Sequence, residues 1–134
     1  MAETKVPARP LSPHLQIYRP MLTMMMSIVH RITGIALYFG IILLVWWLIA
    51  GAVSAEYFAM TQAVFGHWLS KIVLFGFTWA LIHHMLGGLR HLLWDTGHGF
   101  KLPAVEFMAR ANLVLSILLT LALWIGVYLA RGTL

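Results

Sequence analysis

The chain has 134 residues, of which 61% are hydrophobic and only 10% are charged. A soluble domain usually carries about 25% charged residues, so this composition argues against a soluble protein and indicates a membrane protein. Cysteine is absent, which excludes disulfides, thiolate metal sites and a cysteine nucleophile. The formal net charge is +5, but the basic residues flank apolar segments instead of forming one stripe, so we expect no nucleic-acid partner.

Residues 1–26 are expected to form a surface arm. This segment has neither the apolar core and cleavage site of a signal peptide nor the long Arg/Ser-rich character of a transit peptide. Pro10, Pro13 and Pro20 favour an extended or turn-rich backbone.

Three long runs without a charged residue follow, at positions 32–55, 72–89 and 111–130. A helix needs about 20 apolar residues to cross about 30 Å of hydrocarbon. With flanking residues included, the sequence predicts three transmembrane helices at approximately residues 27–53, 64–93 and 107–131. Apolar residues upstream of the second run extend it. We therefore expect an all-α membrane protein, with residues 1–134 forming a single transmembrane anchor domain.

The basic residues predict the orientation of the chain, because lysine and arginine favour the inner side of a membrane. With three crossings, only Lys71 and Arg131 fall on one side. The others share the opposite side: Lys5, Arg9, Arg19, Arg31, Arg90, Lys101 and Arg110. The N-terminus is therefore predicted inside, on the cytoplasmic or matrix side, and the C-terminus outside. Between the second and third spans, Gly97, Gly99 and Pro103 predict a turn.

His84 lies inside the second predicted span, and a histidine within a membrane is by default a functional hypothesis. It lies about 9 Å along the helix from Arg90, at 1.5 Å per residue. On a helix, Gly87 and Gly88 share a face with His84, and His91 continues that face. The bare glycine patch suits either a flat haem with His84 as iron ligand or the close packing of a neighbouring helix. These residues alone do not choose between the two interpretations.

One helix cannot supply both axial ligands of a haem. His91 lies about 10 Å along the axis from His84, and His83 points about 100° away from it. A second ligand must therefore come from another helix, and we expect it from another chain.

The predicted topology places His30 and Arg31 at the same membrane level as Arg90 and His91, with His84 just below them. Haem propionates favour cationic partners near the aqueous face, and His30, Arg31 and His91 are candidates. Alternatively, Arg31 and Arg90 only anchor the chain by the positive-inside rule, and His30 is a surface residue.

Ser27 and Asp95 each allow two interpretations. Ser27 is either a helix N-cap or, with Arg31, a hydrogen-bond donor to a ligand carbonyl at the membrane edge. Asp95 follows His91 by four residues, so it either pairs with that histidine on a helix or caps the C-terminal turn near Gly97.

Two motifs carry a family resemblance. "RPLSPHLQIY" followed by "SIVHRITG", and then "HMLGGLRHLLWDTG", closely resemble the cytochrome b large-anchor subunit of succinate dehydrogenase (complex II). Both signatures occur complete and in order, and the three-span layout agrees with that family. The resemblance covers nearly the whole chain.

The resemblance implies a non-autonomous enzyme subunit of succinate:ubiquinone oxidoreductase. Such a subunit anchors the flavoprotein and iron–sulfur subunits in the lipid bilayer. It also helps to form the site where electrons from succinate reduce ubiquinone. One haem b is shared with the small membrane-anchor subunit, which supplies the second axial ligand.

The same resemblance assigns individual residues. His84 matches the family's axial haem ligand, whereas His83 matches no ligand position. The family's quinone site is matched by Ser27 and Arg31, with Ile28 lining the same pocket. Positions near the haem propionates are matched by His30, Arg31 and His91. One departure is Pro20, where mitochondrial members often carry a tryptophan seven residues before the serine.

Two alternatives to this function stay open. A closely related anchor of a quinol:fumarate reductase would share these motifs, because the direction of electron flow is set by the whole complex. A haem-free structural anchor or small transport component belongs to a different class, and the glycine-flanked face of His84 argues against it. The absence of a recognisable transit peptide favours a bacterial inner membrane over a mitochondrial one.

Overall fold

The computed structural model describes residues 9–10 and 18–132, and all of the regular structure in this part of the chain is helical. In order, the four helices are α1 (Leu22–Val53), α2 (Ala55–Gly66), α3 (Trp68–Asp95) and α4 (Leu102–Arg131). Three of them, α1, α3 and α4, are long and apolar enough to cross a membrane. The prediction of an all-α chain with three candidate spans is therefore confirmed. The inside position of the N-terminus stays a prediction.

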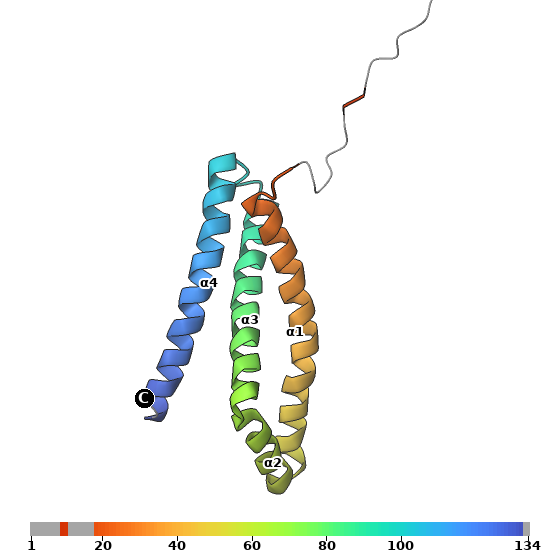
Figure 1. Ribbon diagram of the computed structural model, residues 1–134, viewed down its shortest axis with the longest axis vertical. Helices are drawn as coiled ribbons and strands as arrows, with labels where there is room; N and C mark the ends of the chain where they lie inside the picture. Colours follow the sequence, from red (N-terminus) through yellow and green to blue (C-terminus); the bar gives the residue numbers. More distant parts are fainter. Residues whose placement is uncertain (1–8, 11–17, 133–134) are drawn as a thin grey trace, which may run out of the picture.

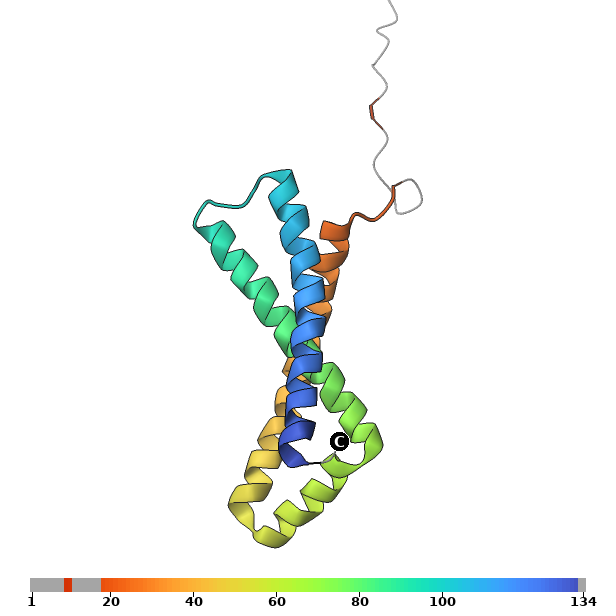
Figure 2. The same ribbon diagram turned by 90° about the vertical axis from the view of Figure 1, so that its left-hand side faces the viewer.

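The three long helices lie side by side, with α3 between α1 and α4 (Figure 1). The start of α1, the end of α3 and the start of α4 lie at one end of the bundle, and α2 lies at the other (Figure 1). A second view shows α3 crossing its neighbours at an angle (Figure 2). This arrangement brings the two sequence motifs, one near the start of α1 and the other near the end of α3, to the same end of the molecule.

The prediction of one continuous second helix from residue 64 is wrong. The chain breaks at His67, whose backbone is extended (φ −64°, ψ 144°), and its Nδ1 accepts a hydrogen bond from the backbone N–H of Leu69 at 3.3 Å. Residues before the break belong to α2 instead, which Ser54 caps by accepting from the N–H of Tyr57 at 3.1 Å. Two capping side chains thus separate α2 from its neighbours.

The other helices begin earlier than the predicted spans. Helix α1 starts at Leu22, so the end of the predicted surface arm is helical. Its N-cap is Met21, which makes no side-chain capping bond. Pro13 and the rest of "SPHLQIY" up to residue 17 lie outside the described residues.

The connection between α3 and α4 is the turn that the sequence predicts. Gly97 and Gly99 have positive φ angles of 81° and 82°, which glycine adopts without strain. Pro103 lies in the first turn of α4, where the missing N–H removes no helical hydrogen bond.

Close packing of α1 against α3 depends on Gly40. This glycine is buried, and a Cβ atom built on it would overlap the ring of Phe77 on α3. In a bilayer, small residues let helices approach closely, because lipid tails provide no hydrophobic driving force between helices.

We expect Gly40→Ala to lower the stability of the folded protein, because the Phe77 ring must move to admit the added methyl group. Overpacking of this kind destabilises by about 1–3 kcal/mol. Thermal unfolding of the protein purified in detergent measures the effect. Gly126→Ala on α4 is the matched control, because nothing lies within 4 Å of its Cβ position. Equal destabilisation by both substitutions would contradict the assigned role of Gly40.

Candidate functional site

Three histidines from α1 and α3 meet at the end of the bundle where α1 begins. The rings of His30 and His84 are stacked, with centroids 3.9 Å apart and planes 6° apart. The ring of His91 lies 5.4 Å from that of His30, tilted by 50°. The prediction that His30 and His91 share one level is confirmed. The ring of His84 faces Gly34, one helical turn further along α1 than His30, which agrees with its predicted position just below that level.

Hydrogen bonds to His84 fix its tautomer. Its Nδ1 lies 3.0 Å from the carbonyl oxygen of His30 and 3.3 Å from Oγ1 of Thr33. A carbonyl oxygen only accepts hydrogen bonds, so Nδ1 carries the proton and donates it. The Nε2 atom then keeps its lone pair. A histidine that ligates a metal usually has this arrangement, in which the other ring nitrogen donates to a carbonyl and orients the ring.

Small residues make room for the stacked rings. A Cβ atom on Gly34 would lie 3.0 Å from Cε1 of His84, and one on Gly87 would lie 2.5 Å from Nδ1 of His30. By contrast, nothing lies within 4 Å of a Cβ atom on Gly88. The helix-packing interpretation therefore holds for Gly87, and the haem interpretation stays a prediction. Gly87 admits a side chain of the neighbouring helix, and Gly88 leaves an open surface one turn from His84.

The residues in and around "SIVHR", at positions 26–33, divide between two sides of α1. Met26 and Thr33 are each 2% exposed and face the bundle, whereas Ser27, Ile28 and Arg31 are exposed. Within the described part of the chain, the side chains of Ser27 and Arg31 make no hydrogen bond or ion pair, so both are available to a ligand or partner.

The N-cap interpretation of Ser27 is wrong, because α1 begins upstream of it at Leu22. Ser27 and Arg31 lie four residues apart within a continuous helix. They therefore point to the same side of α1.

Arg90 and His91 occupy different environments at the end of α3. Arg90 is 8% exposed, and its guanidinium carbon lies 4.9 Å from the centre of the Trp94 ring. His91 is exposed, with its ring edge-on to Trp94 at 5.2 Å. Among the described residues, the only ion pair is Arg110–Glu106, so the first alternative for Asp95, a pair with His91, does not form. Asp95 is the last residue of α3, and Thr96 is its C-cap.

Sequence reasoning assigned no role to Thr33 and Gly34 and missed the stacking of His30 on His84. A helical register gave a partial signal, because His30, Thr33 and Gly34 follow the i, i+3, i+4 pattern of one helix face. Which helix that face meets depends on the packing of α1 against α3.

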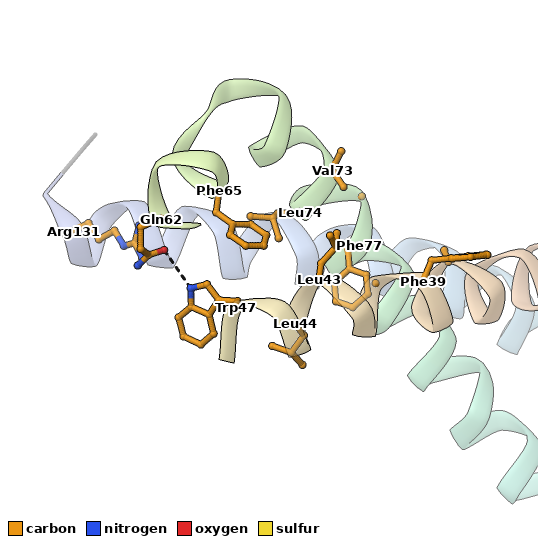
Figure 3. A pocket seen from close by; sticks show the side chains of 13 residues that line it. Phe39, Leu43, Leu44, Trp47, Gln62, Phe65, Val73, Leu74, Phe77 and Arg131 are labelled. Carbon is orange, nitrogen blue, oxygen red and sulfur yellow. Dashed lines mark hydrogen bonds between the residues drawn. The ribbon is translucent and has the colours of Figure 1, made fainter. Parts of the chain in front are cut away.

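A separate groove of about 650 Å³ lies towards the other end of the bundle, between α1, α2 and α3, with Arg131 of α4 at its edge (Figure 3). Its walls are mostly apolar, and Nε1 of Trp47 donates to Oε1 of Gln62 at 3.3 Å within it. The groove contains no residue of the predicted site.

Comparisons with known proteins identify the family of this chain. The family of the succinate dehydrogenase/fumarate reductase transmembrane subunit matches residues 5–125. The succinate dehydrogenase cytochrome b556 subunit of Paracoccus denitrificans is 44% identical over 119 residues, covering 89% of this chain and 92% of that protein. The subunit of the same name from Rickettsia typhi is 43% identical over 117 residues, covering 87% of this chain and 91% of that protein.

A mitochondrial relative is also similar. The succinate dehydrogenase cytochrome b560 subunit of Sus scrofa is 38% identical over 117 residues, covering 86% of this chain and 69% of that protein. Bacterial and mitochondrial relatives thus both match. The chain belongs to the family of succinate dehydrogenase/fumarate reductase transmembrane subunits.

Proposed function

We propose that this chain is the large membrane-anchor subunit of a succinate:ubiquinone oxidoreductase and that it binds haem b and ubiquinone. The observation that carries the proposal is the 3.0 Å contact between Nδ1 of His84 and the carbonyl oxygen of His30, because it leaves Nε2 of His84 free to bind a metal. Family membership supports the complex, and the names of the bacterial relatives favour succinate oxidation over fumarate reduction.

The residues present fit a haem at this site. His84 would ligate the iron through Nε2, and the open surface at Gly88 leaves space on the same helix. The propionates would be held by His30, Arg31 and His91. A bound haem supplies reversible one-electron chemistry. The small membrane-anchor subunit would provide the second axial ligand, because no other histidine among the described residues is placed to share the iron.

This chain's own contribution at His84 is to orient the imidazole. The His30 carbonyl and the Thr33 hydroxyl hold the proton at Nδ1, and the His30 ring covers one face of the His84 ring. Gly34 lets α1 approach that ring closely. These contacts restrict both the position of the ring and its tautomer before any ligand binds.

Ubiquinone would bind on the exposed side of α1. The Ser27 hydroxyl and the Arg31 guanidinium would donate hydrogen bonds to a quinone carbonyl, and Ile28 would contact the ring. Because these residues are exposed in the single chain, the rest of the pocket would come from the iron–sulfur subunit and the small anchor subunit. The flavoprotein would bind through the iron–sulfur subunit on the same side of the membrane. The location we propose is a bacterial inner membrane with the N-terminus inside.

The visible spectrum of the purified complex tests this function. We expect reduction to produce the absorption bands of a b-type haem, with one haem per copy of the chain, in a preparation that reduces ubiquinone with succinate. A preparation that catalyses this reaction without any haem absorption would overturn the haem assignment. Such a result would favour a haem-free anchor.

A further inference from the structure

Two consecutive histidines connect α3 to the helices on either side of it. Successive side chains on a helix point about 100° apart. His84 stacks on His30 of α1, whereas Nδ1 of His83 lies 3.3 Å from Oγ of Ser116 on α4. Since α3 lies between α1 and α4 (Figure 1), the two contacts hold it from both neighbours.

The hydrogen bond between His83 and Ser116 has a defined direction. The Ser116 hydroxyl donates to the carbonyl oxygen of Leu113 at 2.9 Å, so its oxygen is left to accept from His83. The proton of His83 is therefore on Nδ1, and His83 donates. His83 is 0% exposed, and its buried Nε2 has no hydrogen-bond partner among the described residues. The bond to Ser116 is thus the polar contact that orients this ring.

The composition of the interface between α3 and α4 makes this hydrogen bond important for how the two helices are oriented. Helix α4 buries small or polar residues along one face: Ala109, Asn112, Ser116 and Thr120. Between helices in a bilayer, such small residues permit close approach, and hydrogen bonds across the interface favour one relative orientation. A second bond runs from Nε1 of Trp124 to Oγ1 of Thr78 at 3.3 Å, further along α3.

We infer that His83 is a positioning residue for His84. Its hydrogen bond to Ser116 fixes the rotation of α3 about its axis, and with it the direction of the His84 Nε2 atom. A rotation of about 20° would move a side chain about 6 Å from the helix axis by about 2 Å. Metal–ligand distances tolerate only about 0.2 Å. This inference rests on the proposed function, in which His84 ligates the haem iron.

The test uses the electron paramagnetic resonance spectrum of the oxidised haem in the purified complex, because its g values report the orientation of the axial imidazoles. We expect Ser116→Ala and His83→Leu to shift the g values. His83→Asn should restore them, because the asparagine Nδ2 takes the place of the histidine Nδ1 donor. His83→Gln should not restore them, because its amide nitrogen replaces Nε2 instead. Ser116→Ala removes a single oxygen atom, so it keeps the test valid if a larger change prevents assembly.

Thr78→Val is the matched control, because it removes the other hydrogen bond between α3 and α4 without touching His83. It should shift the g values less than Ser116→Ala does, because Thr78 lies further from His84 along α3 than His83 does. Unshifted g values in Ser116→Ala and His83→Leu would overturn the inference, and so would an equal shift in Thr78→Val or a failure of His83→Asn to rescue. Failure of the proposed function has a different signature, in which His84→Ala itself leaves the haem spectrum unchanged.

Discussion

His84→Ala is expected to abolish the low-spin haem spectrum of the complex. The substitution removes the imidazole whose Nε2 lone pair is free and whose Nδ1 proton is held by the His30 carbonyl at 3.0 Å. Alanine has no atom that can ligate iron, so the haem would lose one of its two axial ligands or leave the site. Absorption and electron paramagnetic resonance spectra of the purified complex measure the loss, and gel analysis of its subunits establishes that the complex is assembled.

His98→Ala is the control for removing an imidazole near the same end of the bundle. His98 is exposed in the turn between α3 and α4, where its Nδ1 lies 2.9 Å from the Thr96 carbonyl oxygen. Its substitution should leave the spectrum unchanged. An unchanged spectrum in assembled His84→Ala would show that the ligand assignment is wrong.

Arg31→Ala and Ser27→Ala are expected to impair the transfer of electrons from succinate to ubiquinone. Losing one donor in a buried site costs about 1–3 kcal/mol, which weakens quinone binding roughly 5- to 150-fold. Arg31→Ala should have the larger effect, because hydrogen bonds from a charged donor are about twice as strong as neutral ones. The KM for ubiquinone measures the effect.

Reduction of a soluble dye by succinate provides the internal control, since it does not require the quinone site. Both variants should retain it. Arg110→Ala and Ser70→Ala are matched controls: Arg110 is an exposed cation paired with Glu106, and Ser70 lies near the start of α3, at the opposite end of the bundle. Equal loss of dye and quinone reduction would indicate defective assembly and contradict a specific role in quinone binding.

The number and type of the long helices could be predicted from the sequence, because the thickness of the bilayer sets the length of apolar sequence that a spanning helix needs. The break at His67 could not. Residues 63–69 are as compatible with a continuing helix as with a bend. Local capping by His67 and Ser54 decides the outcome, and α2 forms as a result.

The candidate site could be predicted as a set of residues but not as a geometry. Positive-inside topology placed His30 and His91 at one level, and the structure confirms that they meet. The stacking of His30 on His84 depends on the crossing of α1 and α3 and on the absence of side chains at Gly34 and Gly87. No periodicity within a single helix encodes that crossing.

The partner of His83 could not be predicted from the sequence either. Helical geometry indicated that it points away from His84, but not what it meets there. Its partner is Ser116, more than one helix length further along the chain. Among apolar neighbours in α4, a lone serine gives no signal of its own, so the contact emerges only from the packing of α3 against α4.

Rescue by free imidazole tests the central claim, that His84 holds the haem, most directly. His84→Gly leaves a gap beside Gly34 that can admit imidazole, which ligates haem iron as histidine does. We predict that assembled His84→Gly complex lacks the low-spin haem spectrum and that adding imidazole restores it. A low-spin spectrum identical to that of the unaltered complex before imidazole is added would contradict the claim.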